Sequence, residues 1–212
     1  MSSILSFIIY VLSIPFIVTD YSASDSVSLM QYDTTAWKEL KTSDGFLLDI
    51  KYATEDNFIG EAVYPCGRCF LRTDVAEALI RVNESLRQQG YKLKLFDCYR
   101  PRPAQYKLWK KVPDPNYVAN PDKGSMHNRG SAVDLTLTDK SGKELDMGTE
   151  YDFFGQKAHH DCTSLPADVL RHRQKLKSAM EKAGFQSIRT EWWHYSLKGS
   201  SYPLDSWEWQ CD

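Results

Sequence analysis

The sequence lacks a strong excess of either charge: its 212 residues hold 26 lysines and arginines against 28 aspartates and glutamates, for a formal net charge of −2. Nucleic-acid-binding proteins usually carry a clear basic excess, so this composition argues against that class. Internal repeats and low-complexity segments are also missing, and 42% hydrophobic and 25% charged residues are ordinary values for a globular protein. We therefore expect one compact domain rather than a disordered, collagen-like or coiled-coil protein.

A hydrophobic run long enough to span a bilayer is absent as well. The apolar stretch at residues 4–18 is shorter than the ~20 residues that a membrane-spanning helix needs. Small residues follow at 22–24, as at a signal-peptidase site, so we interpret residues 1–24 as a secretory signal cleaved before Asp25. Residues 25–212 then form the mature domain, exported to the periplasm without stable membrane association. Because no lysine or arginine precedes the apolar stretch, a retained N-terminal anchor stays an alternative, as does full secretion.

Cysteines are few, five in all, and each lies in the part predicted to be exported. An oxidising compartment permits disulfides, and the odd count leaves at least one thiol unpaired or paired between chains. Cys66 and Cys69 form a CxxC motif, compatible with a local bridge, a redox pair or half of a zinc knuckle. No second motif follows at knuckle spacing, and no strand–helix context supports a redox pair. We interpret CGRC as a structural loop with two thiols. The disulfide pairing stays open for all five cysteines: Cys66, Cys69, Cys98, Cys162 and Cys211.

Hydrophobic periodicity predicts alternating helices and strands, whereas residues 25–45 show no sustained period and are expected to cover the surface. The predicted strands are residues 45–52, 91–96, 131–138 and a last one that begins near 185 and runs into 191–195, and the predicted helices are residues 74–89, 103–111 and 166–182. Asp74 is expected to cap the first helix together with Glu77. This order is typical of a single α+β domain, with a mostly antiparallel sheet and helices packed on one side.

Histidine is also scarce, with five residues, so the surroundings of each one are informative. His127 lies in a turn, and Asp134 follows on the polar face of the next strand, where an unpaired carboxylate among apolar residues would be costly. These two residues alone are equally compatible with a metal site and with a carboxylate that accepts hydrogen bonds from the loop. His194, in the EWWHY motif, would be a third ligand and leave a fourth position open for water, which is the layout of catalytic zinc.

Two further residues fit hydrolytic chemistry beside such a metal. Glu191 precedes His194 by three residues, ~10 Å along an extended chain, too far to be a ligand in an ideal strand but suitable for a proton-accepting base. Arg100 lies just beyond the end of a predicted strand, and its guanidinium can hold an oxyanion or a substrate carboxylate. The alternatives are an aromatic edge strand at EWWHY and a surface salt bridge at Arg100. His159 and His160 form a weaker ligand pair, because adjacent side chains of an extended chain diverge.

Four motifs in family order, YRPRP, SxHxxGxAxDLT, DMGTEYDFF and EWWHY, make the sequence resemble the zinc D-alanyl-D-alanine dipeptidases of the vancomycin-resistance type. The resemblance spans residues 44–195 and implies the fold shared with D,D-carboxypeptidases and the hedgehog signalling domain. It also implies the site: one zinc ion per chain on His127, Asp134 and His194, with Glu191 as catalytic base and Arg100 stabilising the transition state.

The resemblance further implies which residues select the substrate. Asp152 matches the aspartate with which the family holds the free amino group, and Ser125 matches a serine of its substrate pocket. Met126 departs from the family pattern at a position where a second serine is common. The implied activity is hydrolysis of the free dipeptide D-alanyl-D-alanine. The alternatives are a zinc D,D-carboxypeptidase or endopeptidase acting on peptidoglycan stems, and a non-catalytic zinc-binding module of hedgehog type.

Overall fold

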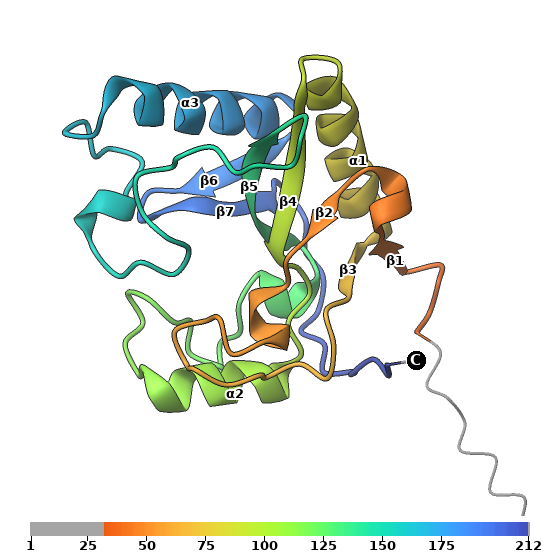
Figure 1. Ribbon diagram of the computed structural model, residues 1–212. Helices are drawn as coiled ribbons and strands as arrows, with labels where there is room; N and C mark the ends of the chain where they lie inside the picture. The colour runs from red at the N-terminus through yellow and green to blue at the C-terminus, as the bar shows by residue number, and fades with distance from the viewer. Residues whose placement is uncertain (1–31, 212) are drawn as a thin grey trace, which may run out of the picture.

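The computed structural model describes residues 32–211, so the predicted signal segment and its cleavage site lie outside the described residues. This part of the chain folds into two sheets and three helices (Figure 1). The strands are β1 (Trp37–Leu40), β2 (Leu47–Leu48), β3 (Cys69–Arg72), β4 (Tyr91–Asp97), β5 (Ala132–Asp139), β6 (Phe185–Ile188) and β7 (Glu191–Leu197), and the helices are α1 (Thr73–Arg87), α2 (Arg102–Lys111) and α3 (Ala167–Lys182). The predicted α+β class is confirmed.

A five-stranded sheet forms the centre of the molecule, in the order β2–β4–β5–β7–β6. β2 runs parallel to β4, and the other neighbours are antiparallel, so the sheet is mostly antiparallel as predicted. β1 and β3 form a separate antiparallel pair. α1 and α3 pack next to each other against the central sheet, whereas α2 lies at the opposite end of the molecule (Figure 1). The end of β4 therefore leads into the loops that surround α2.

The strand register aligns three polar residues across the middle of this sheet. Asp134 on β5 pairs with His194 on β7 and, on its other side, with Asp97 at the end of β4. A β-bulge between Leu95 and Asp97 shifts the register by one residue. Bulges of this kind can change the direction in which a side chain points. Residues directly opposite each other in antiparallel strands have Cβ atoms ~5 Å apart on one face. The register alone therefore brings Asp134 and His194 together.

The prediction for the last strand is wrong in one respect, because residues 185–195 form a hairpin. β6 ends at Ile188, Arg189 and Thr190 turn the chain, and β7 begins at Glu191, which pairs back with Ile188. The turn contains neither glycine nor proline, the residues that most often mark a hairpin in a sequence. Glu191 is consequently the first residue of the strand that follows the turn.

The N-terminal part is more regular than its sequence pattern predicts. Within residues 25–45, the four residues of β1 pair with β3, a strand that periodicity did not indicate. The predicted strand at 45–52 is correct only for β2, because Lys51–Ala53 form a 3₁₀ turn. Strands of two to four residues are too short to show an alternating pattern, which accounts for both errors.

The three predicted helices are confirmed, with ends that differ by no more than two residues. The predicted capping pair is wrong: α1 begins at Thr73, and Asp74 Oδ1 instead accepts a hydrogen bond of 2.9 Å from the amide of Val75. Within residues 32–211, none of the helices combines the length and the apolar character needed to span a membrane.

Two disulfides anchor the CxxC loop, and neither is the local bridge considered from the sequence. Cys66 pairs with Cys211, and Cys69 pairs with Cys98. The interpretation of the loop as structural is confirmed, but its cysteines are disulfide-bonded rather than free thiols. Cys162 is free, which is one of the two outcomes that the odd count left open.

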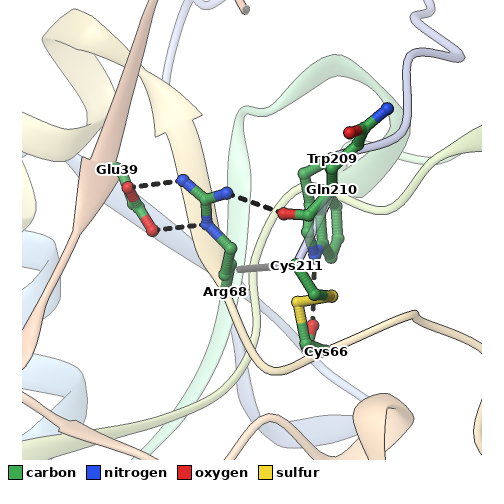
Figure 2. The surroundings of a disulfide bond; sticks show 6 residues. All are labelled: Glu39, Cys66, Arg68, Trp209, Gln210 and Cys211. Atoms are coloured by element: carbon green, nitrogen blue, oxygen red, sulfur yellow. Dashed lines mark hydrogen bonds and ion pairs between the residues drawn. A yellow bond between two sulfur atoms is a disulfide. The ribbon is translucent and has the colours of Figure 1, made fainter. Parts of the chain in front are cut away.

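The first of these bonds ties the C-terminal segment to the loop (Figure 2). Arg68 donates hydrogen bonds of 2.7 and 2.9 Å to the Glu39 carboxylate and one of 2.9 Å to the backbone carbonyl of Gln210. The indole of Trp209 donates to the carbonyl of Cys66 at 3.1 Å. Covalent and polar contacts thus hold the C-terminal segment beside β1 and β3.

Candidate active site

The residues predicted for the site line a single cavity of about 360 Å³, a volume typical of small-molecule sites. These residues are Arg100, Ser125, His127, Asp134, Asp152, Glu191 and His194. The cavity lies where β5 and β7 meet the loops on either side of β5 and the turn before β7, and Leu108 of α2 closes part of its wall. The fold therefore brings together side chains that are spread over more than ninety residues of sequence, from position 100 to position 194.

Three of these residues each place one ligand atom within 4.8 Å of the others, the one such cluster among residues 32–211. His127 Nε2 lies 3.2 Å from Asp134 Oδ1 and 3.1 Å from His194 Nδ1. Asp134 Oδ1 and His194 Nδ1 are 3.0 Å apart. Two imidazole nitrogens and a carboxylate oxygen suit zinc, and catalytic zinc sites have three protein ligands.

The turn that carries His127 depends on a glycine. Residues His127–Arg129 form a 3₁₀ turn that ends on Gly130 at a φ of 68°, a conformation that residues with a Cβ atom rarely adopt. The amide of Gly130 donates to the carbonyl of His127 at 3.0 Å. A Cβ atom at this position would collide with the ring of Trp37. Both the turn and the close approach to β1 therefore require glycine.

Hydrogen bonds behind the ligand atoms fix their orientation. His127 Nδ1 lies 2.7 Å from the backbone carbonyl of Cys98. Because a carbonyl only accepts, Nδ1 carries a proton, and in the neutral imidazole Nε2 therefore keeps its lone pair. The Tyr151 hydroxyl donates to Asp134 Oδ2 at 2.9 Å, which leaves Oδ1 directed at the two histidines. Such supporting contacts are typical of zinc ligands, so the donor set and its surroundings both fit this metal.

The charges of the ligand residues stabilise one another. Burial lowers the pKa of His127, but the Asp134 carboxylate outweighs that effect and raises it. Burial likewise raises the pKa of Asp134, yet His127 and His194 hold it well below its usual range. The carboxylate in the middle of β5 therefore stays ionised because cationic or hydrogen-bonding partners surround it.

Arg100 is fixed by neighbours that the sequence analysis did not identify. Its Nε and Nη2 donate to Asp97 Oδ2 at 3.0 and 2.7 Å, and its Nη1 donates to Gln105 Oε1 at 2.9 Å. The Tyr64 hydroxyl donates to the other oxygen of Asp97 at 2.7 Å. Arg100 is only 7% exposed, so the alternative of a surface salt bridge is wrong. A carboxylate at the end of β4, just before YRPRP, is the sequence signal for this arrangement.

Two further carboxyl groups of the cavity are strongly desolvated. Removal from water raises the pKa of Glu191 to about 7 and that of Asp152 to about 8. Asp152 accepts a hydrogen bond of 2.8 Å from the Tyr52 hydroxyl. Among the described residues, it is also the one non-glycine position with a positive φ, 57°. A strained backbone and a perturbed pKa at one residue are typical of functional positions.

Three tyrosines that the sequence analysis did not identify orient three carboxylates of the site. Tyr52 donates to Asp152, and, as described above, Tyr64 and Tyr151 donate to the carboxylates on β4 and β5. The ring of Tyr52 packs against those of Tyr64 and Tyr151, with centroids 5.9 and 6.2 Å apart. A buried tyrosine follows the same hydrophobic pattern as a phenylalanine, so its polar role is invisible to periodicity.

Of the remaining candidates, Ser125 lines the cavity, whereas His159 and His160 do not. Ser125 Oγ accepts a hydrogen bond of 3.2 Å from the amide of His127 at the cavity wall. The rival pair does not join the site: neither His159 nor His160 lines the cavity. His159 Nδ1 contacts Arg189 Nη1 at 3.0 Å, and burial lowers the pKa of His160 to about 4.

The chain is similar to known proteins over most of its length. The family described as D-ala-D-ala dipeptidase matches residues 40–212. A D-alanyl-D-alanine dipeptidase of Escherichia coli (strain K12) is 40% identical over 165 residues, which cover 77% of this chain and 86% of that protein. One of Enterococcus faecium is 36% identical over 180 residues, covering 75% and 89%. The solved structure of a vancomycin-resistance D,D-pentapeptidase in complex with Zn(II) aligns with a TM-score of 0.41 at 16% identity, covering 62% of this chain and 74% of that one.

Proposed function

Because this chain belongs to the D-ala-D-ala dipeptidase family and is therefore a hydrolase of the metallopeptidase type, we propose that it cleaves free D-alanyl-D-alanine into two molecules of D-alanine. One zinc ion is held by His127, Asp134 and His194 in this proposal. The observation that carries it is the convergence of these three ligand atoms in a cavity that Glu191 and Arg100 also line.

The side chains around the metal divide the hydrolytic step among them. A zinc ion at this site supplies a Lewis acid for the peptide carbonyl and lowers the pKa of water. Glu191 takes a proton from the attacking water and passes it to the nitrogen of the departing D-alanine. Arg100 donates to the oxygen that becomes negative as the carbonyl carbon turns tetrahedral. Asp97 and Gln105 already hold the guanidinium, so little reorganisation is needed.

Asp152 supports recognition of a free amino group. Burial is the largest of the effects that raise its pKa to about 8, and the ammonium of a dipeptide would supply the positive charge that favours the ionised form. The resulting charge-assisted hydrogen bond is stronger than a neutral one. An N-acylated peptide has no such cation and would leave the carboxyl without a cationic partner. We assign Ser125, on the same cavity wall, to binding of the substrate as well.

The test is release of D-alanine from D-alanyl-D-alanine and from its N-acetyl analogue, with and without a chelator. We expect kcat/KM for the free dipeptide to exceed that for the analogue by roughly a hundredfold or more, because a buried carboxylate without a cationic partner is costly. Chelation should abolish release, and added Zn²⁺ should restore it. A preference for the acylated substrate would indicate a D,D-carboxypeptidase instead. Zinc binding without hydrolysis of either substrate would indicate a non-catalytic module.

We also propose that residues 1–24 direct export to the periplasm and are then removed. The two disulfides support this proposal, since disulfides persist in oxidising compartments and are rare in the cytosol. Cell fractionation and N-terminal sequencing test it. A mature chain that begins at Asp25 in the periplasmic fraction is expected, whereas a chain that keeps residues 1–24 and sediments with membranes would indicate an anchor.

A further inference from the structure

The proposed reaction gives no role to the CxxC loop, yet one of its disulfides ends at a residue that contacts a predicted zinc ligand. Cys98 supplies the backbone carbonyl that accepts the hydrogen bond from His127 Nδ1. The sulfur of the same residue is bonded to Cys69 on β3. Both cysteines are fully buried. Cys98 therefore links β3, through the disulfide, to the predicted zinc ligand His127, through the hydrogen bond.

The segment that contains Cys98 lies beyond the ladder of the central sheet, since β4 ends at Asp97. The amide of Tyr99 donates to the carbonyl of Phe70 on β3 at 2.8 Å, and the amide of Arg100 donates to the carbonyl of His127 at 3.1 Å. The Cys69–Cys98 bond is the covalent member of this set of contacts. It holds the Cα atoms of the two cysteines 5.3 Å apart.

We propose that the Cys69–Cys98 disulfide is a positioning element of the metal centre. By fixing the backbone of Cys98, it fixes the carbonyl that keeps the proton of His127 on Nδ1 and the lone pair on Nε2. Without the disulfide this carbonyl gains freedom, and the imidazole can rotate or take the tautomer that has no lone pair on Nε2. Both changes weaken metal binding. This inference rests on the proposed function, because it takes His127 as a zinc ligand.

The second disulfide is a matched control that starts from the same loop. The Cys66–Cys211 bond spans a sequence separation of 145 residues, against 29 for Cys69–Cys98. A bond that closes a longer loop restricts the unfolded chain more, so its loss is expected to lower the thermal stability at least as much. No hydrogen bond described above joins the backbone carbonyl of Cys66 or Cys211 to a predicted ligand residue. Loss of Cys66–Cys211 is therefore expected to have the larger effect on thermal stability, and loss of Cys69–Cys98 the larger effect on zinc affinity.

The experiment compares the double variants Cys69→Ala/Cys98→Ala and Cys66→Ala/Cys211→Ala with the wild type. The zinc dissociation constant is measured by competition with a chromophoric chelator, the ligand geometry by the absorption bands of Co²⁺ bound at the site, and the stability by Tm. Loss of Cys69–Cys98 should raise the zinc dissociation constant about tenfold, the lower end of what loss of a ligand-orienting partner costs, and should shift the Co²⁺ bands. Loss of Cys66–Cys211 should lower Tm and leave both metal readouts unchanged.

Two results would overturn the inference: an unchanged zinc dissociation constant in the Cys69→Ala/Cys98→Ala variant, or equal weakening in both variants. If the alanine pair does not fold, Cys69→Val/Cys98→Ala restores part of the buried volume and the comparison is repeated. A wild type that binds no zinc would instead contradict the proposed function, so the two failures are distinguishable.

Wild-type protein provides an independent measurement, because the coupling of two equilibria is reciprocal. In a glutathione buffer, two glutathione thiols transfer two electrons and two protons to the Cys69–Cys98 disulfide and become glutathione disulfide. If this disulfide favours zinc binding, zinc must favour the disulfide by the same factor. Alkylation and mass spectrometry should show that saturating Zn²⁺ protects Cys69–Cys98 and leaves the reduced fraction of Cys66–Cys211 unchanged. Equal or greater reduction of Cys69–Cys98 with zinc would refute the inference.

Discussion

Asp134 and Asp152 line the same cavity, but their neighbours shift their pKa values in opposite directions. Around Asp134, two imidazoles outweigh burial and lower the pKa of the carboxyl. Around Asp152, burial is the largest effect, and the hydrogen bond from Tyr52 offsets it only in part, so the pKa rises to about 8. At the scale of single residues, this contrast supports assigning one carboxyl to a metal and the other to a cationic substrate.

Replacement of His127, Asp134 or His194 by alanine should abolish stoichiometric zinc binding, because each change leaves two of the three ligands that a catalytic zinc site has. Metal analysis after dialysis measures this. Ser125→Ala is the control, since Ser125 lies beside the ligands without being one of them, and it should retain the metal. Full zinc occupancy in any of the three alanine variants would remove that residue from the ligand set.

Glu191→Gln should keep the zinc and lower kcat by at least about a hundredfold, because the amide has the size of the base but cannot accept the proton. The base form of Glu191 is the active one, so activity should fall as the pH drops through its pKa. Burial sets this pKa at about 7, and a bound dication lowers it. The acid limb of the kcat profile is therefore expected at or below pH 7. A variant with near-normal kcat would contradict the assigned role.

Asp152→Asn should reduce the preference for the free dipeptide over its N-acetyl analogue. The variant loses the charge that pairs with the ammonium, whereas the analogue has no ammonium to lose. The ratio of the two kcat/KM values, measured on both proteins, tests this. If Asp152 only stabilises its loop, the ratio will stay the same.

The same variant has a predicted effect on stability. Folding raises the pKa of Asp152 from its ordinary value of 3.8 to about 8, so between these values the unfolded chain releases a proton that the folded chain keeps. By linkage, this group makes the protein less stable as the pH rises through that range. Asparagine removes the effect and tolerates the positive φ. The Tm of Asp152→Asn should therefore exceed that of the wild type at pH 8 and match it at pH 4.

At the scale of secondary structure, the sequence predicted the elements that have a long periodic pattern. All three helices and the central strands β4 and β5 were identified, because each shows its period over at least six residues. β1 and β3 were missed because each has four residues and pairs with a distant partner. The β6–β7 turn was missed because it holds no turn-forming residue. Pattern length, rather than burial, separates the successes from the failures.

The sequence predicted which residues belong to the candidate site, but it did not predict the neighbouring residues that orient them. The ligand candidates stand in local motifs, and the structure brings all of them into one cavity; their roles stay predictions. The contacts of Asp97, of the three tyrosines and of the Cys98 carbonyl depend on register, a bulge and a disulfide. Each of these joins residues that are distant in sequence, so no local pattern reports them.

Gly130→Ala tests the turn that connects His127 to β5. A Cβ atom would collide with Trp37 and would force an L-residue to a φ of 68°, and we expect a loss of ~3 kcal/mol in the free energy of unfolding together with weaker zinc binding. Gly90→Ala is the control: its φ is 84°, and a Cβ atom there meets nothing within 4 Å. It should cost only ~1 kcal/mol and leave zinc binding intact. Urea unfolding and zinc titration measure both. Equal losses in the two variants would contradict the steric argument.

At the scale of the whole molecule, the predicted metal ligands join three separate parts of the chain: a turn, β5 and β7. Zinc that binds only the folded chain should therefore stabilise the entire domain, by ~2.7 kcal/mol when its free concentration is a hundred times the dissociation constant. Calorimetry with zinc and with a chelator measures the shift in Tm. His194→Ala should show no such shift. A wild type whose Tm is indifferent to zinc would contradict the assigned centre.

The span of the Cys66–Cys211 bond imposes an order in time on the maturation of the protein. A chain is synthesised from its N-terminus, so Cys69 and Cys98 are available to each other long before Cys211 appears. During that interval Cys66 has no native partner, while Cys162, which is free in the folded protein, emerges before Cys211 and competes for it. A wrong pair between them can be corrected only by thiol–disulfide exchange. The Cys69–Cys98 bond can therefore form early. The Cys66–Cys211 bond can form only later, and only if Cys162 has not reacted with Cys66 before Cys211 appears.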